Sequence, residues 1–271
     1  MLAPALAVVL TKLITKEGWR DIRFRPGLKR YFRWYLLAWF GPSLLILAGV
    51  ALYFLVYPAA FDPANSLATQ ATLAQLAAQG IPAEPAAIVG ALLGQLFLAM
   101  LVAPLLNLFF CAGEELGWRG SLLPLLLKRF GMKAALLLSG LIWGLWHAPM
   151  IAMGHNYGLG YPGWPWGGIL AMIAFCFAVG CFFSLLSLKT QSFWPAALAH
   201  GALNGMAAAG LMFLKAGVDP NPFVGPLATG IIGGAGLVVM GLLCFFLMKK
   251  PLPLPEELTV QPSASDFFQQ P

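Results

Sequence analysis

Charged residues are scarce in this chain of 271 residues, which has 16 Lys and Arg and 10 Asp and Glu, or 10% of the sequence. An ordinary soluble domain carries about 25%. Hydrophobic residues make up 60% of the chain, in runs long enough for membrane-crossing helices. The composition therefore excludes a cytosolic enzyme, a secreted domain and a disordered chain, and it predicts an integral membrane protein.

Cysteine is also sparse, and its four positions lie inside apolar runs: Cys111, Cys176, Cys181 and Cys244. Buried cysteines usually act as small hydrophobic residues. No CxxC pair occurs, so the sequence supports neither a disulfide framework, nor a redox motif, nor a cysteine-type zinc site.

The net charge of +6 would suggest a nucleic-acid partner in a soluble protein. Here 14 of the 16 basic residues, all except Arg119 and Lys215, fall in segments that the predicted spans place on one side of the membrane. Cytoplasmic loops of membrane proteins carry an excess of Lys and Arg. We therefore expect the charge to set topology in a lipid bilayer, with both termini in the cytoplasm and no nucleic acid bound.

We predict an all-α fold, a polytopic transmembrane helical bundle over residues 34–250 with a catalytic core at 101–214. Residues 1–33 should form a short N-terminal interfacial or partial helix and a basic cytoplasmic segment, and residues 251–271 a cytoplasmic tail. The run 86–127 is too long for one straight helix and should kink, for example at Pro104. The bundle should have about six main spans: 34–58, 86–127, 134–153, 169–188, 195–214 and 227–248.

Five ionisable residues remain at membrane depth, namely Glu114, Glu115, Arg119, His147 and His200. Such residues are costly in lipid and indicate a functional site, although each could also serve a structural ion pair or hydrogen bond. Glu115 and Arg119 are four residues apart and can pair on one helix face. His200 and Asn204 have the same spacing, so an imidazole and an amide lie side by side.

The spacing also predicts a common depth for these groups. Glu114 lies 17 residues before Gly131, and His147 lies 16 residues after it. If the chain reverses at Gly131 as a helical pair, the two side chains lie level. His200 is 11 residues past Lys189, or about 15 Å along a helix from the same face.

A carboxylate, two imidazoles and an amide at one depth permit two chemistries. In one, a glutamate acts as general base on water while histidine and asparagine stabilise an oxyanion. In the other, Glu114, His147 and His200 hold one divalent metal such as zinc. Spacing alone does not choose between a metal and no cofactor. It does not support a serine triad.

Three ordered motifs in the chain resemble the signature of the CPBP intramembrane protease family, which contains the type II CAAX prenyl endopeptidases. EELGWRG (114–120) is similar to EExxxR, WGLWH (143–147) to FxxxH, and HGALN (200–204) to HxxxN. Trp143 stands at the position of the family's usual Phe, an aromatic change that should preserve packing.

The resemblance implies an intramembrane protease with a cavity in which a peptide bond is cleaved. Glu114 and His147 would activate water, and His200 and Asn204 would stabilise the oxyanion. Glu115 and Arg119 would support and orient the site. The family has been described both as metalloproteases and as glutamate-dependent enzymes.

The substrate implied by the resemblance is a peptide or protein, either prenylated at a CAAX terminus or processed in bacterial peptide maturation or immunity. By the same resemblance we expect the protein in a bacterial plasma membrane. Two other functions stay open on the sequence. One is a non-catalytic membrane adaptor, and the other is an ion-coupled transporter, which would be expected to show an inverted repeat.

Overall fold

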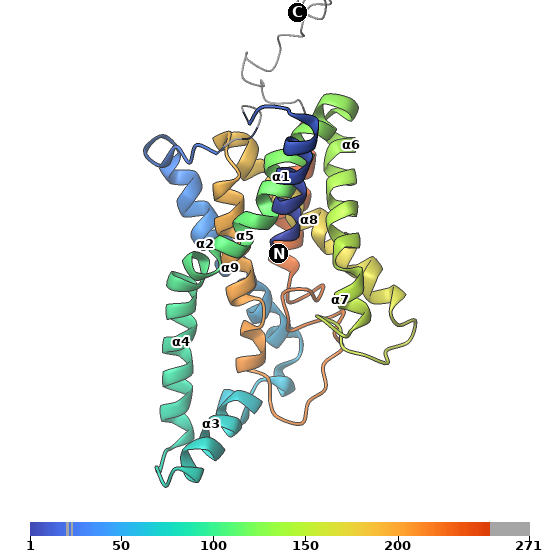
Figure 1. Ribbon diagram of the computed structural model, residues 1–271. Coiled ribbons are helices and arrows are strands. Elements are labelled where there is room, and N and C mark those ends of the chain that lie inside the picture. Colours follow the sequence, from blue (N-terminus) through green and yellow to red (C-terminus); the bar gives the residue numbers. More distant parts are fainter. Residues whose placement is uncertain (20–21, 23, 250–271) are drawn as a thin grey trace, which may run out of the picture.

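Helices make up the regular structure of the residues described in this computed structural model, 1–19, 22 and 24–249 (Figure 1). Within those residues, strand pairing is limited to two isolated antiparallel bridges, Phe61 with Leu214 and Ser66 with Lys215. The prediction of an all-α fold is confirmed. The predicted tail, 251–271, lies outside the described residues.

Three described helices are long and apolar enough to cross a membrane: α2 (Leu28–Val56), α4 (Pro85–Leu106) and α8 (Trp166–Thr190). They correspond to the predicted spans 34–58 and 169–188 and to the first half of 86–127. The chain is therefore an integral membrane protein, as predicted.

The predicted run 86–127 breaks at Asn107, three residues after Pro104. After α4 come α5 (Leu108–Glu115) and the π-helix η3 (Leu116–Leu122). Proline cannot donate a backbone hydrogen bond, which weakens the helix at its end. Figure 1 shows α5 continuing at an angle to α4.

The next helix, α6 (Leu123–Trp146), contains a break at Gly131, where φ is 71°. Glycine takes this left-handed conformation without the penalty that a Cβ adds. The chain reverses there, and the second part of α6 leads into the short α7 (Ala148–Ala152). The reversal at Gly131 that the depth argument requires is therefore present.

The remaining predicted spans are short helices. The range 195–214 contains α9 (Trp194–Met206) and the 3-10 turn η4 (Ala209–Met212), and 227–248 contains α10 (Ala235–Leu247). Six complete crossings therefore stay a prediction, with three long helices and several shorter apolar ones in the described residues.

Segments that carry basic residues, among them the turn at 128–133 and the end of α8 at Lys189, meet at one end of the molecule (Figure 1). There the indole N–H of Trp194 donates to the Phe24 carbonyl at 2.8 Å, and Lys133 donates to the Phe245 carbonyl near the end of α10. The opposite end holds η1 (Pro58–Ala60), η2 (Pro63–Asn65) and α3 (Leu67–Ala78) (Figure 1). The predicted alternation of the loops, and the membrane side that each end faces, stay predictions.

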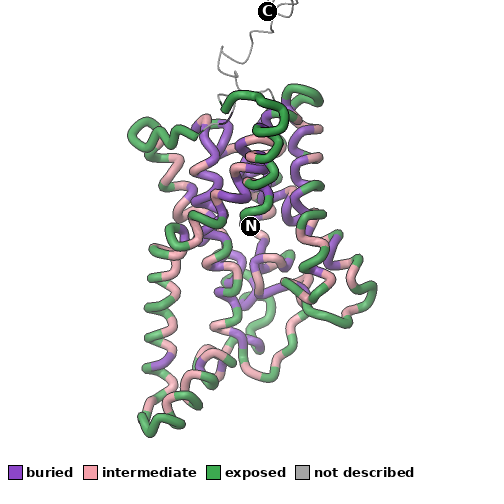
Figure 2. Tube along the Cα trace, in the orientation of Figure 1, coloured by how far each residue is buried: buried purple, intermediate pink, exposed green. Residues whose placement is uncertain are grey.

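The core surrounds α8, which packs against α2, α6, α9 and α10. Figure 2 shows the buried residues gathered in this central part of the bundle. Gly140 and Gly144 let α6 approach α8 closely, because an added Cβ would lie 2.5 Å from Phe177 Cα and 2.4 Å from Ile173 Cα. Small residues at such crossings let helix backbones pack directly in membrane proteins.

The N-terminal helix α1 (Ala3–Thr15) lies against α5 and η3. It meets Gly113 and Gly117, where added Cβ atoms would lie 2.7 Å from Leu2 Cδ2 and 2.5 Å from Pro4 Cβ. The predicted short helix is thus present, packed on the segment that carries Glu114 and Glu115. Its interfacial placement stays a prediction.

Candidate active site

The two neighbouring acids lie where α5 ends and the π-helix η3 begins. π-Helical turns are rare and occur frequently at functional sites. In this turn Trp118 reaches back to Glu114, and Arg119 reaches back to Glu115, four residues earlier in each case. The neighbouring acids Glu114 and Glu115 therefore bind two different kinds of side chain, an indole and a guanidinium.

Glu114 is 3% exposed, and two indoles hold one of its oxygens. The Trp118 Nε1 donates to Oε2 at 3.2 Å, and the Trp143 Nε1 donates to the same oxygen at 3.1 Å. Among the described residues, none is recorded as donating to Oε1. Glu114 thus has one fixed oxygen and one available for another donor.

Glu115 is fully buried and forms an ion pair with Arg119, whose Nη1 lies 3.0 Å from the carboxylate. The His200 Nδ1 lies 2.9 Å from Oε1 of the same residue. The predicted pair of Glu115 and Arg119 is therefore present. The structure adds that His200 is bonded to Glu115.

Aromatic rings cover the buried Arg119 guanidinium. Its Cζ lies 4.5 Å from the centre of the Trp143 ring and 5.5 Å from that of Phe183, within the range of cation–π attraction. Gly180 of α8 leaves the space that the guanidinium occupies, because a Cβ there would lie 3.0 Å from Nη2. Arg119 is therefore held by α6 and α8 as well as by Glu115.

His147 follows α6 directly and is half-buried. Its Nδ1 lies 2.8 Å from the backbone oxygen of Trp143. A carbonyl oxygen only accepts, so this nitrogen carries the proton in the bond and Nε2 of a neutral ring has a free lone pair. His147 can therefore accept a hydrogen bond through Nε2.

The two predicted residues of α9 differ in exposure. His200 is 4% exposed, with its ring centre 5.4 Å from Trp143 and 5.7 Å from Phe183. Asn204, one turn later, is exposed, and its Nδ2 contacts the Cys111 Sγ at 3.6 Å. The described structure thus brings Glu114, Glu115, Arg119 and His200 into one buried cluster, with His147 beside it and Asn204 at its edge.

The conditional metal set Glu114, His147 and His200 is not assembled as a ligand cluster. Each member has another partner: two indoles, the Trp143 carbonyl and the Glu115 carboxylate, respectively. Across the part of the chain that is described, no group of three His, Cys, Asp or Glu side chains has the arrangement of a metal site. In this arrangement the three side chains do not form a ligand cluster, and the conditional metal site stays a prediction.

The sequence reasoning missed three contributors: Trp118, Phe183 and Gly180. Trp118 could have been found from its spacing, because it lies four residues after Glu114. Trp143 was expected only to preserve packing, whereas its N–H also bonds to Glu114. Phe183 and Gly180 carry no sequence signal, because their role depends on where α8 lies.

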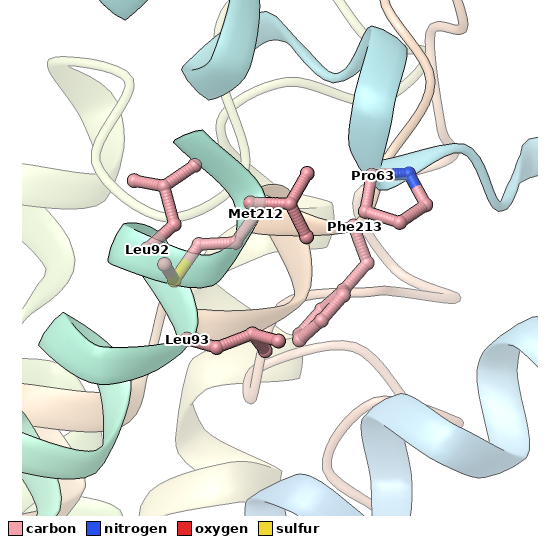
Figure 3. Close-up of a pocket in the computed structure, with 6 residues that line it drawn as sticks. Pro63, Leu92, Leu93, Met212 and Phe213 are labelled. Atoms are coloured by element: carbon pink, nitrogen blue, oxygen red, sulfur yellow. The ribbon is translucent and has the colours of Figure 1, made fainter. Parts of the chain in front are cut away.

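A cleft at the opposite end of the bundle differs from this site in chemistry. Figure 3 shows apolar side chains around it, and it is lined by Pro63, Val89, Leu92, Leu93, Met212 and Phe213. None of these side chains can transfer a proton or stabilise an oxyanion. This cleft therefore offers no catalytic group.

Comparison with known proteins identifies the segment that carries this cluster. Residues 89–206 match the family model of the type II CAAX prenyl endopeptidase Rce1-like proteins. This segment is an Rce1-like domain. The resemblance inferred from the three motifs is confirmed, and all six candidate residues lie inside the Rce1-like segment.

A CAAX prenyl protease 2 from Methanococcus maripaludis is 41% identical over 56 residues, which are 20% of this chain and 21% of that protein. The aligned part thus spans about a fifth of the curated relative. No solved structure matches the chain.

Proposed function

We propose that the protein is an intramembrane endopeptidase that hydrolyses a peptide bond at the cluster around Trp143. The observation that carries this proposal is the convergence of the three motifs. A carboxylate with one free oxygen, a histidine with a free Nε2 and a second histidine on a carboxylate lie around a single indole ring. The Rce1-like match supports the same reaction.

Glu114 acts as the general base. Its Oε1 accepts a proton from a water molecule as the water oxygen attacks the carbonyl carbon of the scissile peptide bond. The proton then passes to the amide nitrogen, the C–N bond breaks, and a carboxylic acid and an amine leave. Because both indoles bind Oε2, the basic oxygen keeps one orientation.

His147 orients the attacking water. Its Nδ1 is engaged by the Trp143 carbonyl, so Nε2 accepts a hydrogen bond from the water. The half-buried position makes this ring one of the accessible members of the site.

His200 and Asn204 stabilise the oxyanion of the tetrahedral intermediate. His200 requires a proton on Nε2 for this role, and the Glu115 carboxylate on Nδ1 stabilises the positive charge of the doubly protonated ring. Arg119 balances the remaining charge of Glu115. Asn204 supplies an exposed amide N–H at the edge of the cluster.

The substrate is a peptide or protein, and the family match points to a prenylated CAAX terminus. Cleavage of a farnesylated CAAX peptide should be compared with that of the same peptide without the lipid. Faster cleavage of the lipidated peptide supports a prenyl substrate. Equal cleavage assigns the enzyme to general peptide processing.

The direct test is Glu114→Gln in purified full-length protein. Removing a general base should lower the cleavage rate by about 100-fold or more. Glu84→Gln is the matched control, because Glu84 is an exposed carboxylate before α4 and should leave the rate unchanged. Undiminished cleavage by Glu114→Gln would overturn the proposal.

The same assay tests the metal-independent form of this mechanism. Because the donor atoms do not converge on a common point, we expect the cleavage rate to survive stringent chelation. Loss of cleavage on chelation and its return with added zinc would replace the general-base mechanism by a metal-dependent one.

A further inference from the structure

Trp143 contacts four of the polar groups in the cluster. Its Nε1 donates to Glu114, and its backbone oxygen bonds to the His147 Nδ1. Its ring faces Arg119 at 4.5 Å and His200 at 5.4 Å. A side chain needed only to fill space would not require the indole N–H to point at a carboxylate.

We propose that Trp143 and Trp118 are positioning residues that hold Glu114 through Oε2 and thereby present Oε1 to the attacking water. This inference rests on the proposed function for its catalytic consequence. The hydrogen bonds themselves, and their effect on the protonation of Glu114, do not depend on which substrate is cleaved.

The nature of the partners explains why Glu114, rather than Glu115, can act as base. Arg119 neutralises Glu115, whereas the donors recorded on Glu114 among the described residues are two uncharged indoles. A hydrogen bond from an uncharged donor stabilises a buried carboxylate and orients it, yet leaves its negative charge uncompensated. Two adjacent acids are thus given separate tasks by their donors.

The two indoles approach from different elements. Trp118 belongs to η3 and its ring lies 5.9 Å from that of Trp146, while Trp143 is 2% exposed in α6. The Glu114 carboxylate is therefore fixed from its own helical segment and from the neighbouring one. Trp118 alone would follow any rotation of η3, and Trp143 ties the orientation to α6.

The test replaces each indole by a ring without a donor, in Trp143→Phe, Trp118→Phe and the double variant. Each single change should lower kcat about tenfold with little change in KM, and the double variant should lose more. The acid limb of the pH–rate profile should move to higher pH, because a carboxylate without its donors is protonated more readily. Trp166→Phe is the matched control, since that residue is 70% exposed and should leave both readouts unchanged.

A second readout does not require activity. Infrared difference spectra during an acid titration report the C=O band of the protonated Glu114 carboxyl, which Glu114→Gln assigns by removing it. In Trp143→Phe this band should appear at higher pH than in the unaltered protein. An unchanged onset, in a variant with unchanged thermal unfolding, would overturn the proposal.

Failure of the proposed function can be told apart from failure of this inference. If no substrate is cleaved but the band shifts, the indoles position Glu114 in a protein with another role. If Trp143→Phe does not fold, benzothienylalanine at position 143 retains the ring shape without the N–H donor. An unshifted band in that protein and in Trp118→Phe counts against the inference.

Discussion

Helices α4 and α8 are both long and strongly apolar, yet they occupy opposite environments. In the most apolar window of α8, 67% of the residues are buried, against 6% in that of α4 (Figure 2). Apolarity alone thus marks both as membrane helices without saying whether protein or lipid surrounds them. In lipid there is little hydrophobic force between helices, so packing must come from shape.

Small residues on the neighbours of α8 explain the difference. Gly140 and Gly144 of α6 contact it directly, and Gly241 of α10 faces Ala178, whose backbone oxygen would lie 2.0 Å from an added Cβ. By contrast, nothing lies within 4 Å of a Cβ added at Gly90 or Gly94 of α4. Glycines in α4 therefore face open space, whereas those against α8 are points of helix contact.

Near its last turn, α4 packs closely on α9. There a Cβ added at Gly205 of α9 would lie 2.4 Å from the Ala103 Cβ, and a Cβ added at Gly201 would lie 2.7 Å from the Pro104 backbone oxygen. The candidate active site lies in the packed part of the bundle, where rigid neighbours hold Arg119 and His200. Lipid chains would not hold a guanidinium or an imidazole in place.

The largest loss of stability should come from truncating a buried aromatic side chain in α8. Phe182 is 1% exposed, and Phe182→Ala should cost about 3–5 kcal/mol of unfolding free energy, because it leaves a cavity in a packed core. Phe97→Ala in α4 is the control, since Phe97 is 58% exposed and its place can be filled by lipid. Thermal unfolding in detergent checks both. Equal losses of unfolding free energy in the two variants would contradict the difference in packing between α8 and α4.

The second comparison adds one methyl group to a glycine. Gly144→Ala places a Cβ 2.4 Å from Ile173 Cα, so α6 and α8 must separate, at a cost of about 2–3 kcal/mol. Gly94→Ala in α4 should not destabilise the protein. Denaturation of the two variants side by side measures the difference, and a stable Gly144→Ala protein would contradict the proposed role of this contact.

The third change links packing to the site. Gly180→Ala would bring a Cβ to 3.0 Å from the Arg119 Nη2, so the guanidinium must shift by a few tenths of an ångström in its contact with Glu115. Cleavage should fall about tenfold, equivalent to about 1.4 kcal/mol, with little loss of thermal stability. Gly90→Ala serves as the control on α4. Full activity of Gly180→Ala would show that Arg119 tolerates displacement.

The smallest loss of stability should come from removing one hydrogen bond between the end of α4 and α9. Asn107 Nδ2 donates to the Gly201 backbone oxygen at 3.3 Å, and interhelical hydrogen bonds in membranes contribute about 0.6 kcal/mol on average. Asn107→Ala should therefore lower stability by about that amount. Gln95→Ala, at an exposed position of α4, should change nothing measurable. A loss above about 2 kcal/mol would mean that α4 is held more firmly than this bond allows.

The membrane class, the helical fold and one contact within the candidate site could be predicted, because each depends on composition or on spacing within one helix. The pair of Glu115 with Arg119 is such a case, since a spacing of four places both on one face. The break at Asn107 was harder to locate, because Pro104 weakens the helix without stating where it ends.

The full set of partners of Glu114 and Glu115 could not be predicted from spacing within one helix. Spacing pairs Glu115 with Arg119, but the sequence alone does not say which acid meets His200 and which meets Trp143. For the same reason the conditional ligand set of Glu114, His147 and His200 is not gathered into one cluster, since a common depth does not make side chains point toward one another.

By itself, the sequence determined that the chain enters a membrane as helices, because burial in lipid is set by the apolarity of each segment. Only the tertiary structure decided that α8 is surrounded by protein while α4 is not, and that Trp143 bonds to Glu114. Those outcomes depend on backbone approach and side-chain direction between distant segments, which the order of residues along one helix does not specify.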